Sequence, residues 1–186
     1  MTASNVNSFV AIDVETANSD WGSICQIGVV SVEQGEIVDE WQTLVDPGTP
    51  FMDRNIGIHG ITAWDVELAP TFSGIYADVL AKLAGQVVAC HTMFDRRALR
   101  AACGIYRVEE IDCLWLDTAH VARLTWKQFR QRGYTLDNVA KHLGIEFSHH
   151  DALEDARAAA LVLLRAIEET GLTVRQWQDG EIPDQK

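Results

Sequence analysis

The sequence predicts an α/β protein in which a β-meander is followed by alternating helices and strands, giving a mixed sheet with helices on its faces. Three segments rich in β-branched residues lie within the first 45 residues and are separated by short turns. After residue 70, apolar residues recur with a helical period between short apolar runs. No repeat or Pro/Gly/Ser linker divides the 186 residues, so we expect a single domain over 1–186 with its core at about 8–170.

The N-terminal segments are typical of antiparallel strands joined by tight turns. Phe9–Ile12 is a short apolar run that ends in acidic residues, which predicts a buried strand whose end meets solvent. A second strand is expected over 24–32, and Gln34-Gly35 supplies a turn. The third strand is expected over 36–45, closed by Asp46-Pro47-Gly48.

Helices and short strands then alternate. Residues 71–84 place their apolar side chains on one helical stripe. The longest helix is expected over 151–169, where Asp151 is the N-cap and Glu154 completes a capping-box-like pattern. The remaining predicted elements are strands at 86–90 and 114–116 and helices at about 94–103, from 118, and at 135–143 before Gly144.

Composition indicates an ordinary globular protein, with 47% hydrophobic and 23% charged residues, no apolar run long enough for a membrane helix and no signal-like N-terminus. Four scattered cysteines suggest buried thiols in a reducing compartment, so we expect a cytoplasmic protein. The net charge of −12 argues against a protein that grips long duplexes, because phosphate contacts usually require basic faces. An acidic nuclease that holds a short strand end on divalent cations remains compatible with this charge.

Three acidic clusters follow predicted strands or begin predicted helices. Asp13 and Glu15 lie two residues apart, so both point to the same side of an extended chain. Asp95 follows the strand at 86–90, and His150 precedes Asp155 at the start of the longest helix. Each cluster alone has a simpler explanation, as a solvated turn or a helix cap. Together, they can meet at one edge of the sheet.

Four carboxylates brought together need cations, because each pair within ~4 Å costs about 4 kcal/mol at an effective dielectric near 20. An oxygen-rich site suits Mg²⁺ or Mn²⁺ rather than zinc. Two such ions can clamp the attacking and leaving oxygens of a phosphoryl displacement. His150 can accept the proton of the attacking water near neutral pH.

These residues resemble the motifs of the DEDDh (DnaQ-like) 3′–5′ exonucleases, which include the epsilon subunit of bacterial DNA polymerase III and RNase T. The matching segments, in order, are Asp13-x-Glu15-Thr16, His59-Gly60-Ile61-Thr62, His91-x-x-Phe94-Asp95 and His150-x-x-x-x-Asp155, within residues 8–168. The resemblance implies an RNase H-like fold with a mixed five-stranded sheet of order 3-2-1-4-5 and an antiparallel strand 2. It also implies two divalent cations on Asp13, Glu15 and Asp155, with Asp95 bound directly or through water, and His150 as general base.

The resemblance further places four residues at the substrate. Thr16 and Ala17 would approach the 3′-terminal nucleotide, His59 would line its pocket, and Phe94 would pack beside the last base. A turn histidine and a core phenylalanine are the alternatives for the last two. Many relatives carry Asn where this chain has Thr92, which leaves that loop's substrate contact open.

Two basic segments and one histidine have alternative explanations. Arg96, Arg97 and Arg100 would contact a strand backbone or balance nearby acids. The segment 126–132, in which Trp126 and Phe129 alternate with Lys127, Arg130 and Arg132, would bind a single strand or form a surface loop with buried aromatics. The four-residue gap to Asp155 selects His150 as the base and makes His149 a solvated neighbour.

The leading hypothesis is a 3′–5′ exonuclease that acts on single-stranded or frayed ends, with DNA favoured over RNA, in proofreading or DNA repair, and that releases nucleoside 5′-monophosphates. An RNase T-like or oligoribonuclease-like RNA exonuclease and a non-catalytic polymerase-associated module are the alternatives. About 18 residues follow the longest helix, which favours a stand-alone enzyme over a tethered subunit and leaves a homodimer open.

Overall fold

The computed structural model describes residues 7–183. Five strands form one sheet in the order β3-β2-β1-β4-β5, which confirms the predicted RNase H-like topology. β2 is antiparallel to β1 and β3, whereas β4 and β5 continue parallel to β1. The strands are β1 (Phe9–Thr16), β2 (Ile24–Glu33), β3 (Glu36–Leu44), β4 (Val87–Cys90) and β5 (Leu114–Asp117).

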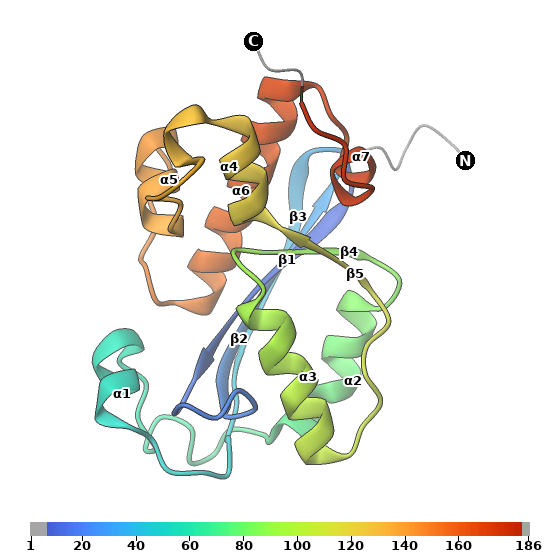
Figure 1. The fold of residues 1–186 in the computed structure, drawn as a ribbon. Helices are drawn as coiled ribbons and strands as arrows, with labels where there is room; N and C mark the ends of the chain where they lie inside the picture. The colour runs from blue at the N-terminus through green and yellow to red at the C-terminus, as the bar shows by residue number, and fades with distance from the viewer. Residues whose placement is uncertain (1–6, 184–186) are drawn as a thin grey trace.

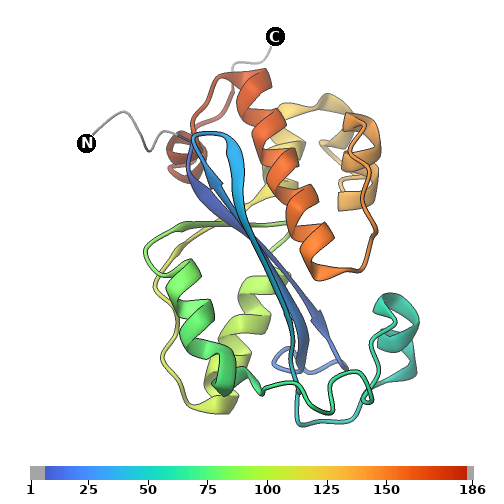
Figure 2. The same cartoon turned by 180° about the vertical axis from the view of Figure 1, so that it is seen from behind.

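Helices cover both faces of this sheet (Figures 1 and 2). On one face, Val10, Ile12 and Val14 pack into a hydrophobic cluster with α2 and α3. On the other, Phe9 and Ala11 pack beneath α6. The helices are α1 (Asp53–His59), α2 (Phe72–Leu83), α3 (Phe94–Tyr106), α4 (Thr118–Thr125), the 3-10 turn η2 (Lys127–Phe129), α5 (Leu136–Leu143), α6 (Ala152–Thr170) and α7 (Val174–Gln178).

The acidic pair of the first motif lies inside β1, not after it. β2 continues to pair with β1 as far as Thr16, so Asp13 and Glu15 are strand residues that keep the alternation of the apolar run before them. Both therefore lie on the face covered by α6, and Val14 points to the opposite face. The expectation that the strand stops at the first acid is wrong, although the shared orientation of the two acids is confirmed.

The turns and helix ends predicted from single residues are confirmed by the structure. Gln34 and Gly35 both have positive φ, as a tight hairpin turn requires. Asp151 caps α6 by accepting hydrogen bonds from the backbone N–H groups of Leu153 and Glu154. Gly144 ends α5 in the left-handed region.

Two short helices were not expected from the sequence. α1 has seven residues and buries none of them, so its sequence has no apolar stripe from which a helix could be predicted. α7 packs Val174 and Trp177 into the cluster under α6, which extends the packed residues beyond 170. Within residues 7–183, no helix combines the length and the apolar character needed to cross a membrane. The N-terminal stretch considered for a signal peptide falls mostly at 1–6, outside the described residues.

Candidate active site

Three carboxylates from two elements converge on one face of the sheet. Asp13 and Glu15 of β1 and Asp155 of α6 each offer an oxygen within 4.8 Å of the other two. Asp155 is buried, and the two β1 acids are half-buried. The predicted meeting of the first and third motifs is therefore present in the structure.

The start of α6 reaches β1 because β2 provides a residue without a side chain at the contact. Gly28 pairs with Asp13, and a Cβ built on Gly28 would lie 2.3 Å from the carbonyl carbon and oxygen of Ala152. Beside it, the Gln26 side chain accepts a hydrogen bond from the Ala152 N–H at 3.1 Å. These contacts hold the first turn of α6, and with it Asp155, against the acidic end of β1.

Asp95 joins the cluster from the start of α3 but faces a different partner. Its side chain is 2% exposed, and Oδ1 accepts a hydrogen bond from the Val14 N–H at 3.0 Å. The ladder between β1 and β4 covers only Val10 and Ala11 on β1, so Asp95 satisfies a strand donor beyond the end of that ladder. Asp95 is not the N-cap of α3, which is Met93, but it lies in the first turn of that helix.

Burial and mutual repulsion perturb these acids. Burial, followed by repulsion from Asp95, Asp155 and Glu15, raises the pKa of Asp13 well above its ordinary value. The same causes, burial first and then Asp155, raise the pKa of Glu15 to about 8. The pKa of Asp95 is raised to about 7, mainly by burial. A positive charge placed among these acids would stabilise their ionised forms.

Two adjacent histidines contact Asp155 through different atoms. The His149 Nδ1 donates to Asp155 Oδ1 at 2.7 Å, and the His150 backbone N–H donates to Asp155 Oδ2 at 2.9 Å. The two imidazole rings are stacked with centroids 3.9 Å apart. His149 is exposed, as expected, but it is more than a solvated neighbour because it orients the buried carboxylate.

The His150 side chain is left available by this arrangement. Its backbone adopts φ +69°, a left-handed conformation that lets its N–H turn toward Asp155. Burial, followed by the neighbouring positive charge of His149, lowers the pKa of His150. Burial and, to a smaller extent, the charge of His150 lower the pKa of His59.

A pocket of about 430 Å³ opens beside Glu15. Three of the four residues expected at the substrate, Thr16, His59 and Phe94, line it. The fourth, Ala17, is fully buried and does not line the pocket. Residues that sequence reasoning missed complete the lining from loops and α1: Asn18, Ser19, Asp20, Trp21, Met52, Arg54, Asn55 and Ile58.

His59 lines this pocket and also ties α1 to β1. The Ile61 N–H donates to His59 Nδ1 at 3.0 Å, so Nε2 carries the proton and donates to the Thr16 carbonyl at 3.2 Å. Asn55 donates to the same carbonyl at 2.8 Å. His59 is therefore part of the pocket wall and not only a turn residue.

The loop after β4 is tightly held. His91 is half-buried, with Nδ1 3.0 Å from the Thr118 hydroxyl and Nε2 donating to the Tyr134 carbonyl at 2.8 Å. Thr92 has φ +78°, a strained conformation for a β-branched residue, and its N–H donates to Asp117. Asn tolerates this conformation far better than a β-branched residue does.

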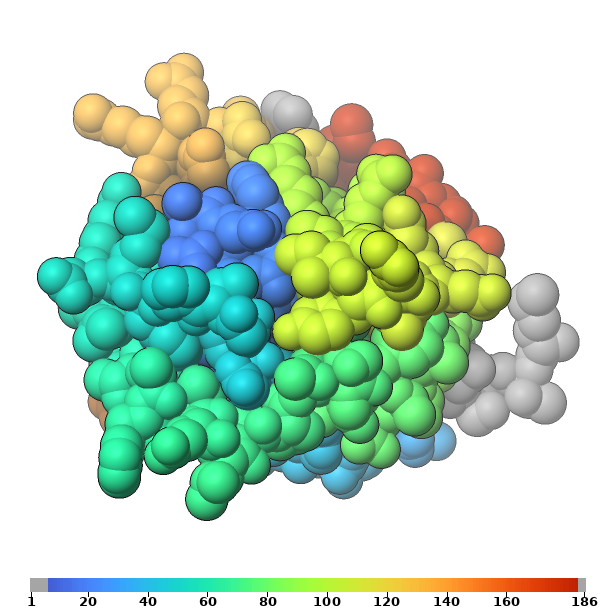
Figure 3. Space-filling view, turned by 90° about the horizontal axis from the view of Figure 1, so that it is seen from below, coloured from blue at the N-terminus to red at the C-terminus, as the bar shows by residue number. Residues whose placement is uncertain are grey.

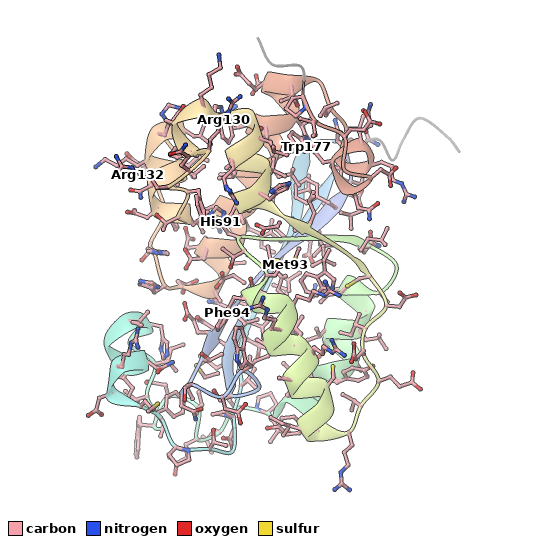
Figure 4. The ribbon with its side chains drawn as sticks, viewed as in Figure 1. His91, Met93, Phe94, Arg130, Arg132 and Trp177 are labelled. Carbon is pink, nitrogen blue, oxygen red and sulfur yellow. The ribbon has the colours of Figure 1, made fainter. Side chains whose placement is uncertain are left out.

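The basic segments separate into two cases. Figure 4 shows Arg130 and Arg132 on the connection between α4 and α5, above His91 and Phe94. Phe129 is buried and Trp126 is half-buried against the core, as expected of a surface loop with buried aromatics, and strand binding by this segment stays a prediction. On α3, Arg100 pairs with Glu110 as a balancing charge.

Residues 10–163 match the RNase T exonuclease family model. The chain belongs to this exonuclease family. Membership confirms the DEDDh resemblance, the RNase H-like fold and 3′–5′ exonuclease as the class of enzyme. The family depends on divalent metal ions, and the acidic cluster lies within the matched residues.

Among curated relatives of this exonuclease, the DNA polymerase III PolC-type protein of Thermotoga petrophila is 35% identical over 167 residues. That alignment covers 87% of this chain and 12% of the relative. The PolC-type protein of Bacillus subtilis is 26% identical over 177 residues, again 12% of its length. The chain therefore spans about an eighth of the length of these much larger relatives.

Solved structures show the same fold. Exonuclease X, in complex with 5′ overhanging duplex DNA, superposes with a TM-score of 0.76 at 25% identity, covering 91% of this chain and 97% of its own. A 3′-exonuclease that recognises a histone mRNA stem-loop gives a TM-score of 0.72 at 19% identity, covering 91% and 85%.

Proposed function

We propose that this exonuclease removes the 3′-terminal nucleotide of single-stranded or frayed DNA and releases a nucleoside 5′-monophosphate. One observation supports this activity above the others. The three carboxylates of Asp13, Glu15 and Asp155 lie together, His150 lies next to Asp155, and Glu15 also lines the pocket. The pocket's volume of about 430 Å³ falls within the range of about 300–1,000 Å³ typical of small-ligand sites. A pocket of this size suits one terminal nucleotide.

The residues present fit two divalent cations. The carboxylates of Asp13, Glu15 and Asp155 are hard oxygen donors. The raised pKa values of Asp13 and Glu15 show that their charged forms are disfavoured by burial and mutual repulsion, which bound cations would relieve. Asp95 would take part directly or through water, since only its Oδ1 is engaged by Val14. When bound, Mg²⁺ or Mn²⁺ would supply positive charge to the scissile phosphate and to the attacking water.

Residues of the chain would provide positioning and proton transfer. Thr16 and His59 would hold the terminal nucleotide in the pocket, and Phe94 would pack against its base. A ring nitrogen of His150 would accept the proton of the attacking water, because the lowered pKa keeps this imidazole neutral at neutral pH. His149 would hold Asp155 in orientation through the 2.7 Å hydrogen bond.

DNA is the preferred substrate in this proposal. The relatives named PolC-type are DNA polymerases, and exonuclease X was solved with DNA. RNA is the second candidate, because the 3′-exonuclease neighbour of similar fold recognises an mRNA stem-loop. The ribose 2′-hydroxyl would decide between them. Processing within a proofreading or repair pathway, cytoplasmic location and a homodimer are further parts of the proposal that activity alone does not test.

A 5′-labelled oligonucleotide tests the proposal directly. With Mg²⁺ or Mn²⁺, we expect a ladder that shortens from the 3′ end, nucleoside 5′-monophosphates as products, and complete inhibition by EDTA. DNA and RNA oligomers of one sequence, present in the same reaction, report the sugar preference. No shortening of either oligomer would contradict the proposal.

A further inference from the structure

A second pocket, about 730 Å³, adjoins the one beside Glu15 and shares with it the residues Asp20 and Trp21. Trp21 thus stands between the two pockets. Phe94 lines only the first, and Arg97, one turn later on α3, lines only the second. The two pockets therefore meet at Trp21, and of the two only the first is lined by an acid of the cluster, Glu15.

The loop that carries Trp21 is fixed against α3. A Cβ on Gly22 would lie 3.2 Å from the backbone of Ala101 and of Ala102, so the loop packs directly on the helix. The side chain of Asp20 accepts the Gly22 N–H at 3.0 Å. In Figure 3 this blue segment lies between α1 in teal and α3 in yellow-green. A rigid loop holds its aromatic side chain at a fixed place on the surface.

Trp21 has the surroundings of a binding group and not of a core residue. Its side chain is 40% exposed. Its ring centroid lies 5.1 Å from that of Phe94, which is itself 38% exposed, and the Arg97 guanidinium lies 5.3 Å from the Trp21 ring centre. Arg100 is held by Glu110 at 3.0 Å, so Arg97 is the cation that accompanies the indole.

We propose that Trp21 and Arg97 form a second nucleotide subsite, which holds the nucleotide next to the 3′-terminal one. The inference rests on the proposed function, because it assumes that the first pocket takes the terminal nucleotide. The exposed part of an aromatic ring packs against a base of any sequence, and the guanidinium that lies over this ring would bind the phosphate that accompanies the base. In a chain of net charge −12, a cation placed beside an exposed indole is a local match for a nucleic acid.

If Arg97 belongs to a second subsite, its substitution should reduce kcat/KM for a long substrate more than for a substrate that fills only the first pocket. The p-nitrophenyl ester of thymidine 5′-monophosphate fills only the first pocket, whereas a DNA hexamer reaches both. Arg97→Ala is compared with Arg96→Ala, because Arg96 is its exposed neighbour on α3 and lines neither pocket. We expect the ratio of kcat/KM values, hexamer over ester, to fall about tenfold in Arg97→Ala and to stay unchanged in Arg96→Ala.

A binding measurement separates this inference from the proposed function. Fluorescence anisotropy of a labelled DNA hexamer, with calcium in place of magnesium, reads affinity without turnover. The Kd should rise about tenfold in Arg97→Ala and not in Arg96→Ala. If the wild type binds in this way but cleaves nothing, the proposed function fails and the subsite stands. Equal Kd values and equal kcat/KM ratios for the two variants would overturn the subsite.

Discussion

The close approach of α6 to β2 makes Gly28 a sensitive point for activity, although it touches no substrate. In Gly28→Ala, the new methyl group would meet the backbone of Ala152 and of Leu153 at 2.3 Å. Both neighbours are backbone and cannot rotate away. The start of α6 must therefore retreat from the sheet, and Asp155 moves with it.

The size of this effect follows from the contact. The helix must move by roughly 0.7 Å before the gap reaches the 3.0 Å that real Cβ contacts respect. A misplacement of about 1 Å at a catalytic group can cost about 100-fold in rate. Overpacking a tight contact typically costs about 1–3 kcal/mol of stability. We therefore expect kcat to fall by about 100-fold and the free energy of unfolding to fall by about 1–3 kcal/mol.

Steady-state cleavage of a DNA oligomer and urea unfolding measure the two effects on the same preparation. Gly57→Ala is the matched control, because a Cβ there meets nothing within 4 Å, its helical position favours alanine, and it lines neither pocket. The control should keep its activity and gain stability of about 0.5–1 kcal/mol. Wild-type kcat and stability in Gly28→Ala would refute the argument that this contact sets the position of Asp155.

Three other changes have definite expected outcomes. Thr92→Asn should raise the free energy of unfolding in urea by about 1 kcal/mol, because it relieves a β-branched residue at φ +78°; a decrease would contradict the strain. His149→Ala should weaken Mn²⁺ binding, measured by calorimetry, by about tenfold through loss of its hydrogen bond to Asp155; unchanged affinity would remove that role. Without divalent cations, the Tm should fall as the pH rises from 4.5, the ordinary pKa of Glu15, through its raised pKa of about 8. The protonated carboxyl stabilises the folded protein, and this stability is lost when the carboxyl ionises. Excess Mg²⁺ should abolish that fall, and a cation-free Tm that rises over this interval would contradict the raised pKa.

Much of the fold was predictable because its signals are local. The hairpin turn at Gln34-Gly35, the cap at Asp151 and the Gly144 stop are each set by the conformational preference of one or two residues. The acidic motifs were predictable as a set because strand alternation and helical spacing determine which way their side chains point. Their roles at the metal and substrate remain predictions.

What the sequence did not reveal depends on contacts between distant segments. α1 buries no residue and has no apolar stripe, so its position comes from ties such as His59 and Asn55 to the Thr16 carbonyl. Trp21 lies in an irregular loop, and its proposed role in binding follows only from its contacts with Phe94 and Arg97, which are distant in sequence. The continuation of β1 through its acids depends on pairing with β2, which no pattern within residues 9–16 reports.

We propose that Asp13, Glu15, Asp155 and His150 act together on a phosphodiester bond. The most direct measurement is the single-turnover cleavage of a 5′-labelled oligonucleotide by the wild type, Asp155→Asn and His150→Ala, with melting curves for each protein. We expect 3′–5′ shortening by the wild type and a loss of most activity in both variants, with folding retained. Near-normal rates in either folded variant would place the chemistry elsewhere.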